Sequence, residues 1–359
     1  MTLCSQVVDF IWLGFVARGF YQSQVGTLLL TVLLYAAMPK GFFPSQDTGV
    51  IQAMTEAPQS ISFEAMAERQ QQVARVLLAD PAVQSVSSFI GVDGSNATLN
   101  SGRMLITLRP RAQRDRDALG VMRRLQPALA GLEQAQAVQA AQAAQPSQAE
   151  GGIRTWLQPV QDLTIDDRLS RTQYQFSVED ASSAVLSTWV PRLVQRLQQL
   201  PQLADVASDL QDDGLQAWVE IDRHSASRLG VSTAAIDAVL YNAFGQRLIS
   251  TIFTQSNLYR VVLEVKPQFQ QGPAALSQLY VPGANGRQVP LNAVARISER
   301  RAALTINHVG QFPAATISFN LAPGRSLGEA VTAIRAAQAE LSLPASTQTR
   351  FQGAALAFE

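Results

Sequence analysis

The sequence predicts an α+β protein: one N-terminal transmembrane helix followed by two split-βαβ (ferredoxin-like) modules, the second interrupted by an inserted α+β domain. Three observations lead to this prediction. An uncharged stretch of 19 residues lies at 20–38. The segment DPAVQSVSS, from Asp80, recurs as LPQLADVAS, from Leu200, at an offset of 120 residues. The strand and helix that closely follow the first copy appear about 90 residues late after the second.

Charge and composition narrow the function classes. The 359 residues include 28 Lys plus Arg and 28 Asp plus Glu, so no net positive charge attracts nucleic acid. The single cysteine, Cys4, excludes an intrachain disulfide and a CxxC motif. His224 and His308 are too far apart in sequence for a helical zinc pair. We therefore expect no nucleic-acid partner, no metal site and no cofactor.

The uncharged stretch 20–38 is long enough to cross a bilayer. As a helix it spans about 28 Å, close to the ~30 Å hydrocarbon core. Three polar residues near its start weaken this prediction, and a buried core helix is the alternative. Residues 1–19 stay unassigned, because an interfacial helix and a frayed terminus explain them equally well. The flanking charges do not give the orientation of the helix.

After Gly49 the sequence alternates between strand and helix patterns. Ser62 is placed to N-cap an amphipathic helix, with Glu64 in its first turn. A polar loop punctuated by glycine, 91–102, joins the second strand to the third. Ala/Gln-rich sequence after the second helix indicates a helix that frays into a linker. The predicted elements are strand 50–57, helix 62–78, strand 83–89, strand 104–110, helix 115–132 and strand 155–160.

The second module repeats this order around an insertion. A strand opens at Gln173, a helix covers 181–200, and LPQLADVAS supplies the next strand. The third strand, PAATISFN from Pro313, and the last helix, from Ser326, come only after the block 214–303. That block contains the strand patterns WVEI and LYRVVLEV, the helix VSTAAIDAVLYNAF and the turn VPGANGRQVP. We interpret it as a domain inserted into the second module.

One motif suggests catalysis and fails on its chemistry. The stretch GRSLG around Ser326 fits the G-x-S-x-G pattern of a nucleophile elbow, but that hydrolase class places its histidine base after the serine and both histidines precede it. Ser326 with Glu329 instead fits a helix capping box. Asp212 and Asp213 are adjacent, so in a strand they face opposite ways and form no acid–base pair. Since a phosphate-binding loop pattern is also missing, we expect no catalytic residues and no enzyme activity.

Several long motifs resemble one transporter family. PKGFFPSQDTG, from Pro39 to Gly49, resembles the segment that leaves the seventh transmembrane helix in inner-membrane pumps of the resistance-nodulation-division (RND) efflux family. RLGVSTAAIDAVLYNAFGQRLISTIF, from Arg228 to Phe253, is similar to the docking subdomain of heteromeric Mdt/Mux-type multidrug pumps. NSGRMLITLRPRAQR and INHVGQFPAATISFNLAPGRSLGEA also fit. The resemblance covers that membrane helix and the second periplasmic loop.

The resemblance implies a division of the chain. In the terms of that family it would comprise a transmembrane helix at 20–38, porter subdomain PC1 at 50–168, porter subdomain PC2 at 172–212 and 304–353, and docking subdomain DC at 214–303. PC1 and PC2 would then form a cleft that admits amphiphilic small molecules from the periplasm.

Four positions would line that cleft by their place in the family pattern: Gln52, Met54, Phe89 and Met104. Their polar, aromatic and thioether side chains suit adaptable, weakly specific binding, although alternating core residues would look the same.

The loop 91–102 resembles the family's switch loop, which separates an outer from an inner pocket. Its marked positions are Gly91, Gly94, Asn100 and Gly102, and glycine lets such a loop change its backbone dihedral angles at little steric cost. An ordinary hairpin connection is the alternative.

The resemblance also implies location and partners. We expect the bacterial inner membrane, with the bulk of the chain in the periplasm, and a trimer with other RND subunits that contacts a periplasmic adaptor and an outer-membrane channel. Full pumps carry a proton relay of intramembrane Asp and Lys, which this single stretch lacks. We therefore expect a truncated or partial pump that does not transport alone. The alternative is a membrane-anchored periplasmic scaffold or interaction protein without transport.

Overall fold

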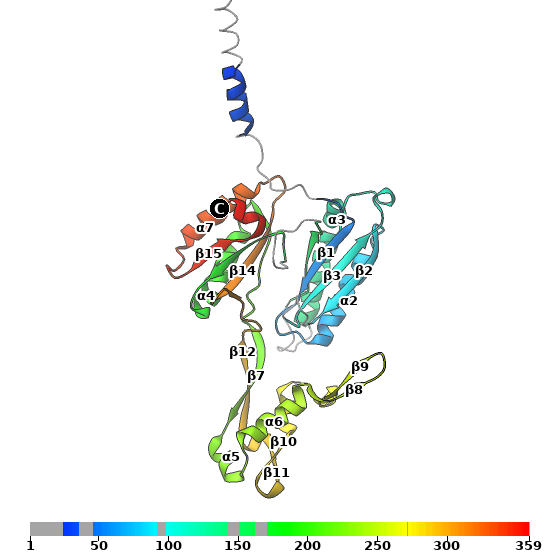
Figure 1. The fold of residues 1–359 in the computed structure, drawn as a ribbon, viewed down its shortest axis with the longest axis vertical. Coiled ribbons are helices and arrows are strands. Elements are labelled where there is room, and N and C mark those ends of the chain that lie inside the picture. The colour runs from blue at the N-terminus through cyan, green and yellow to red at the C-terminus, as the bar shows by residue number, and fades with distance from the viewer. Residues whose placement is uncertain are drawn as a thin grey trace, which may run out of the picture.

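The computed structural model describes residues 24–35, 46–91, 98–142, 151–161, 171–270 and 272–358. Of the predicted membrane segment 20–38, residues 24–35 are described, and they form a helix with exposed side chains. Within the described ranges, no helix is both long and apolar enough to cross a membrane. The predictions for residues 1–19 lie outside those ranges. The rest of the described chain forms two sheet-and-helix modules and an insertion (Figure 1).

The first module is a four-stranded antiparallel sheet with two helices on one face. Its strands lie in the order β2-β3-β1-β4, so the first and third strands are central. The elements are β1 (Val50–Glu56), α2 (Phe63–Leu78), β2 (Val83–Ile90), β3 (Ser101–Leu108), the 3-10 turn η1 (Arg111–Gln113), α3 (Ala118–Gln142) and β4 (Arg154–Pro159).

The helices of this module form for local reasons. The Ser62 hydroxyl accepts a hydrogen bond from the backbone N–H of Ala65 at 3.2 Å, which caps α2. One face of α2 is buried at helical spacing against the sheet. α3 runs to Gln142, ten residues past the predicted end at 132. It continues because the buried amide of Gln136 accepts a hydrogen bond from the Ile153 N–H at 3.0 Å and so holds the Ala/Gln-rich turns against the start of β4.

The second module has the same strand order. β15-β5-β14-β6 form an antiparallel sheet, and the short β13 also pairs with β14. At the start of α7, the Ser326 hydroxyl accepts from the Glu329 N–H and the Glu329 carboxylate accepts from the Ser326 N–H, which confirms the capping box. The elements are β5 (Tyr174–Glu179), α4 (Ser183–Gln198), β6 (Leu203–Ser208), β13 (His308–Val309), β14 (Phe312–Leu321), α7 (Leu327–Leu341), β15 (Gln348–Phe351) and η6 (Gly353–Phe358).

The insertion leaves the second module between β6 and β14. β7 (Gly214–Ile221) and β12 (Ala295–Ala302) pair along their whole length as a two-stranded stalk, which carries the remaining elements away from both modules (Figure 1). One of them, the short helix α5, was not predicted from the sequence. The elements beyond the stalk are α5 (Arg223–Leu229), α6 (Thr233–Phe244), β8 (Arg247–Phe253), β9 (Leu258–Leu263), η2 (Pro267–Phe269), η3 (Pro273–Gln278), β10 (Tyr280–Pro282), η4 (Ala284–Gly286), β11 (Gln288–Pro290) and η5 (Leu291–Ala293).

Each of the three parts has its own hydrophobic core. In the first module Ile51, Met104 and Ile106 pack against α2 and α3. In the second, Phe176 and Phe319 pack against α4 and α7. A third cluster lies under α5 and α6 in the insertion. Separate cores are the physical basis for describing the three parts as distinct structural units.

Candidate functional site

The face of the first sheet opposite α2 and α3 is the candidate site, here called the open face. β1 alternates between half-buried and buried residues, so Gln52 and Met54 point to the open face while Ile51 and Ala53 point to the core. Phe89 in β2 belongs to the same face and is 52% exposed. The structure thus brings together three of the four side chains that were predicted to line a binding cleft.

Strand register aligns four side chains of the open face in one row across the sheet, two of them predicted. Arg103 of β3 lies opposite both Phe89 of β2 and Met54 of β1, and Met54 lies opposite Trp156 of β4. The Arg103 guanidinium lies over the Phe89 ring, 5.7 Å from its centroid. The next row contains Gln52 beside Leu105. Two aromatic rings, a thioether and a cation therefore adjoin one another on an accessible surface.

Met104 does not belong to this face. It is fully buried in the core of the module, where it packs with Ile106 and Met66. The reason is the two-residue period of a strand, which points 104 toward the helices and 103 and 105 away from them. The expectation for Met104 is therefore corrected: Leu105, which is 42% exposed, is the β3 side chain that accompanies Arg103 on the open face.

The loop that joins β2 to β3 begins and ends in defined geometry. Gly91 has a φ of 97°, a conformation that favours glycine. Asn100 is 2% exposed: its side-chain NH2 donates to the Ala57 carbonyl at 2.9 Å, and its backbone carbonyl accepts from the Ala57 N–H at 2.8 Å. Gly94 lies outside the described residues. Asn100 is therefore an anchor of the loop, fixed to the chain that follows β1.

Gly102 lies inside β3, and its role differs from the one expected of it. Its φ is not positive, but a Cβ at this position would come within 2.5 Å of the Gln70 amide and 2.7 Å of the Thr55 hydroxyl. Glycine is needed here because a side chain from α2 crosses the backbone, not because the backbone needs freedom.

Gln70 is the residue that the sequence analysis missed. It lies on the buried stripe of α2, donates to the Ser88 hydroxyl at 3.1 Å and to the Phe89 carbonyl at 3.1 Å, and also contacts the Thr55 hydroxyl. It thereby ties β1 and β2 together directly beneath the aromatic end of the open face. A glutamine within an otherwise apolar helical stripe was the signal that could have revealed it.

Polar contacts connect the first module to the second and to the insertion. The carboxylate of Glu56, at the end of β1, pairs with Arg171 and accepts from the Gln211 amide at 3.4 Å. The Asp213 N–H donates to the Gln59 side chain at 2.6 Å, and Arg301 pairs with the Asp213 carboxylate. The Asp213 carboxylate is thus engaged in an ion pair with Arg301 and forms no acid–base pair with Asp212.

Two cavities lie at this junction. One, of about 460 Å³, is lined mostly by charged and polar residues that include Glu56, Arg154 and Arg301. The other, of about 320 Å³, lies beside Asn100 and the apolar side chains Leu215 and Leu304 at the base of the stalk. Both are spaces between the parts of the molecule, so their size depends on how those parts are placed.

The arrangement supports binding better than catalysis. Ser326 is engaged in its helix cap. The chain's two histidines, His224 and His308, lie outside the first module, and within the described residues no cluster of three His, Cys, Asp or Glu side chains could hold a metal ion. What the open face offers is rings, a thioether, an amide and a positive charge.

Comparison with known proteins identifies the relatives of this fold. The sequence profile of the AcrB/AcrD/AcrF family matches residues 17–359. The chain belongs to that family. This confirms the resemblance to resistance-nodulation-division efflux pumps, whereas the Mdt/Mux type stays a prediction.

Two crystal forms of a heavy metal efflux pump have a similar structure. Form I matches with a TM-score of 0.75 at 21% sequence identity, and form II with a TM-score of 0.76 at 22%. In both, the match covers 94% of this chain and 34% of the pump. The chain therefore spans about a third of the length of these solved structures.

Proposed function

We propose that this chain is the periplasmic porter and docking part of a proton-driven RND efflux transporter, and that it binds amphiphilic substrates on the open face of its first module. In the family's terms the first module is PC1, the second is PC2 and the insertion is DC, and both modules are split-βαβ units. The row of Phe89, Arg103, Met54 and Trp156 is the observation on which the proposal rests.

The chemistry of the open face favours an organic amphiphile over a metal ion. Transition-metal transport needs thiolate, imidazole or carboxylate ligands, and thioether alone suits only the softest ions. Among the open-face residues Met54 is the one sulfur ligand, and the chain's only cysteine is Cys4. Aromatic rings and an unbranched thioether instead adapt to apolar bodies of different shapes, and Arg103 can hold an anionic or polarisable group.

Transport itself would require motion and partners. The polar contacts of Glu56 and Asp213 span the junction between the parts, so the first module could rotate against the second by exchanging a few ion pairs. The chain would lie at the bacterial inner membrane, with its bulk in the periplasm and the segment 20–38 as its anchor. Protons would move through membrane helices outside this sequence, in a trimer that joins an adaptor and an outer-membrane channel.

Dye titration of the full-length chain tests the binding step. We expect saturable binding of a fluorescent amphiphile, measured by polarisation, and a dissociation constant raised about tenfold by Phe89→Ala because an aromatic contact is lost. Leu105→Ala should weaken binding as well. The matched control is Leu78→Ala, which removes a side chain of similar exposure, 53%, from the end of α2 and should leave the dissociation constant unchanged.

Two outcomes would contradict the proposal. Equal losses for Phe89→Ala and Leu78→Ala would point to nonspecific partitioning. If the chain shows no saturable dye binding but still associates with an adaptor protein, the result would favour the alternative of a membrane-anchored scaffold protein, in which the open face binds no substrate. We also propose that the chain is not an enzyme, so Ser326→Ala should change stability through its helix cap and abolish no ester-cleaving activity.

A further inference from the structure

The segment from Arg109 to Arg124, which joins β3 to α3, is the most basic stretch of the chain. It contains six arginines and two aspartates, whereas the whole chain has equal numbers of basic and acidic residues. The corresponding connection of the second module, from β14 to α7, carries one arginine, Arg325, beside Glu329. The charge is thus a property of one module and not of the shared fold.

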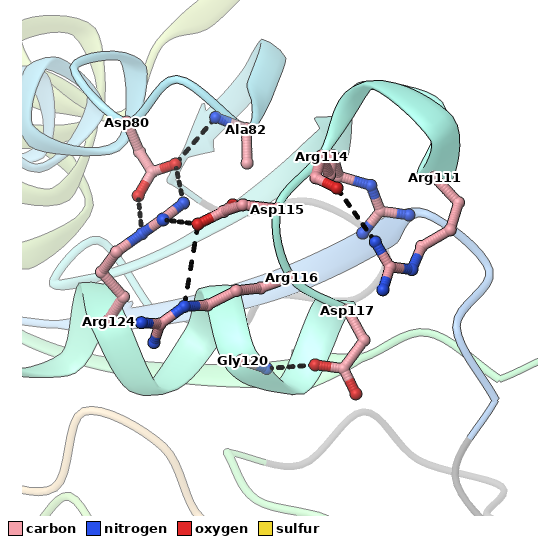
Figure 2. Close-up of polar contacts among 9 residues, drawn as sticks. All are labelled: Asp80, Ala82, Arg111, Arg114, Asp115, Arg116, Asp117, Gly120 and Arg124. Atoms are coloured by element: carbon pink, nitrogen blue, oxygen red, sulfur yellow. Dashed lines mark hydrogen bonds and ion pairs between the residues drawn. The ribbon is translucent and has the colours of Figure 1, made fainter.

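Two of the six arginines are neutralised inside the module. Arg114 has a side chain that is 2% exposed and pairs with Asp47 at 3.1 Å. Arg124 binds both oxygens of Asp80, at 2.7 and 2.8 Å, and also pairs with Asp115 at 2.9 Å (Figure 2). Hydrogen bonding to Asp80 raises the pKa of Arg124 above its ordinary value. These two cations hold the segment in place.

The two aspartates of the segment form their contacts with other residues of the same segment. Asp117 accepts a hydrogen bond from the Gly120 N–H at 2.8 Å at the start of α3, and Asp115 lies between Arg124 and Arg116 (Figure 2). Arg116 is 3.7 Å from Asp115, with both side chains more than half exposed, so this contact is weak.

Three arginines are left facing solvent. Arg109, Arg111 and Arg123 are exposed and form no ion pair with any described residue. Among the residues that the structure describes, Arg111 donates to the Arg114 carbonyl, at 3.0 Å, which holds its guanidinium beside the segment (Figure 2). The segment thus exposes three arginines that the module does not neutralise, and these three, with the weakly paired Arg116, are here called the arginine patch.

The arginine patch lies at the end of the module where the chain arrives from helix 24–35. Asp47, which pairs with Arg114, also accepts from the Ala118 N–H at 3.1 Å, so the patch is joined to the strand start at Val50. Asp47 follows Tyr35 by twelve positions in the chain, a reach of at most about 43 Å. In Figure 1 the helix and the C-terminal end of the described chain both lie at this end of the molecule, opposite the insertion.

We propose that the arginine patch is a docking surface for the headgroups of anionic phospholipids. This rests on the proposed function, because it takes helix 24–35 as part of the membrane anchor. An apolar, exposed helix and three exposed arginines without ion pairs to described residues lie toward the same end of the molecule. Together they are complementary to a bilayer with an anionic surface: the helix to its core and the arginines to its headgroups. Arginine matches phosphate geometry through paired N–H donors. The surface would fix the tilt of the first module relative to the bilayer and so the direction in which its open face points.

Hydrogen exchange of the full-length chain in lipid nanodiscs tests this. One set of discs contains phosphatidylcholine alone and the other phosphatidylcholine with phosphatidylglycerol. We expect peptides from 109–124 to exchange several-fold more slowly in the anionic discs. That difference should vanish in Arg109→Gln/Arg111→Gln/Arg123→Gln and at high salt, because screening shortens the reach of the surface charge. Arg223→Gln/Arg228→Gln/Arg287→Gln removes the same charge from the insertion and should keep the difference.

The outcomes are distinguishable. Equal exchange in both kinds of disc, or protection that persists in the patch variant, overturns the lipid surface while leaving the porter proposal intact. Equal protection by inorganic phosphate, with the chain in detergent and no lipid, would assign the patch to a free anion instead. Failure of the chain to co-elute with either kind of disc would contradict the membrane anchor and, with it, both proposals.

Discussion

The first and second modules share one strand order but differ in the face of the sheet that their helices leave uncovered. In the first module that face carries Phe89 and Leu105, 52% and 42% exposed. In the second, the same face of the sheet carries Gln175 and Ser177 of β5 and Ser318 of β14, all at least 97% buried. One fold thus presents an accessible apolar surface in one copy and a covered polar one in the other.

In both modules, the connection between the second and third strands carries additional structure. Between β2 and β3 the first module has the loop that ends at Asn100, and between β6 and β14 the second has the whole insertion on its stalk. Both segments emerge at the same end of their sheets, where Glu56 and Gln59, at and just after the end of β1, contact Gln211 and Asp213 at the start of the insertion. The two modules therefore share a topology, and they differ in the side chains on the uncovered face of the sheet and in the length of one connection, which are the features that can carry function.

The largest expected effect concerns the Gln70 contacts, which brace the open face. Gly102→Ala would place a methyl group 2.5 Å from the Gln70 amide, so we expect the free energy of unfolding of the first module to fall by about 2–3 kcal/mol. The measurement is hydrogen exchange of β1 and β3, with the second module as internal reference. Dye binding should weaken in parallel because Gln70 holds the Phe89 carbonyl.

Gly131→Ala is the matched control for that substitution. Gly131 lies in α3 with no atom within 4 Å of an added Cβ, so alanine should stabilise the helix by roughly 0.5–1 kcal/mol. The double variant Gln70→Ala/Gly102→Ala should lose less free energy of unfolding than the sum of the two single variants, because Gln70→Ala removes the atoms that the new methyl group at 102 would contact. A fully additive pair would show that Gln70 does not dictate glycine at 102.

The sequence predicted the order of strands and helices better than it predicted surface chemistry, for a physical reason. The 120-residue offset and the cap at Ser62 are local patterns, and they led to the strands and helices found here. Which side chains of β3 face outward depends on the register of β3 with β1. Neighbouring residues of a strand point to opposite faces, so an error of one position in the sequence selected the buried Met104 in place of the exposed Leu105. Gln70 and Gly102 come into contact only in the folded structure, so no spacing in the sequence predicted their contact.

A smaller effect is expected in the second module, which is clipped together by Asp180. Its carboxylate accepts from the Ser182 N–H at 2.8 Å and from the hydroxyls of Ser346 and Thr347 at 2.7 and 2.9 Å. Burial raises the pKa of Asp180, but these hydrogen bonds outweigh it and leave the pKa below its ordinary value. Asp180→Asn should therefore reduce the stability of the module by roughly 1–2 kcal/mol at neutral pH.

The sign of this contribution sets its pH dependence. Because the folded pKa is lowered, the stabilisation is complete above the unfolded value of about 3.9 and is lost as pH falls through the folded value. The gap between the wild type and Asp180→Asn, followed by hydrogen exchange of β5 and β15, should shrink on acidification below about pH 4. A gap that stays constant with pH would mean that the carboxylate charge contributes nothing.

The smallest effect should distinguish the two modules by charge. Arg103 stands on the open face over the Phe89 ring, whereas Arg350 of β15 lies opposite the buried Ser177 in the second module. Arg103→Met keeps an adaptable apolar side chain and removes the cation. Affinity for a cationic dye should therefore rise, and affinity for an anionic dye of similar shape should fall, each by several-fold. Arg103→Lys keeps the charge and should preserve the order of preference. If binding of both dyes weakens together, Arg103 contributes shape to the open face and not charge.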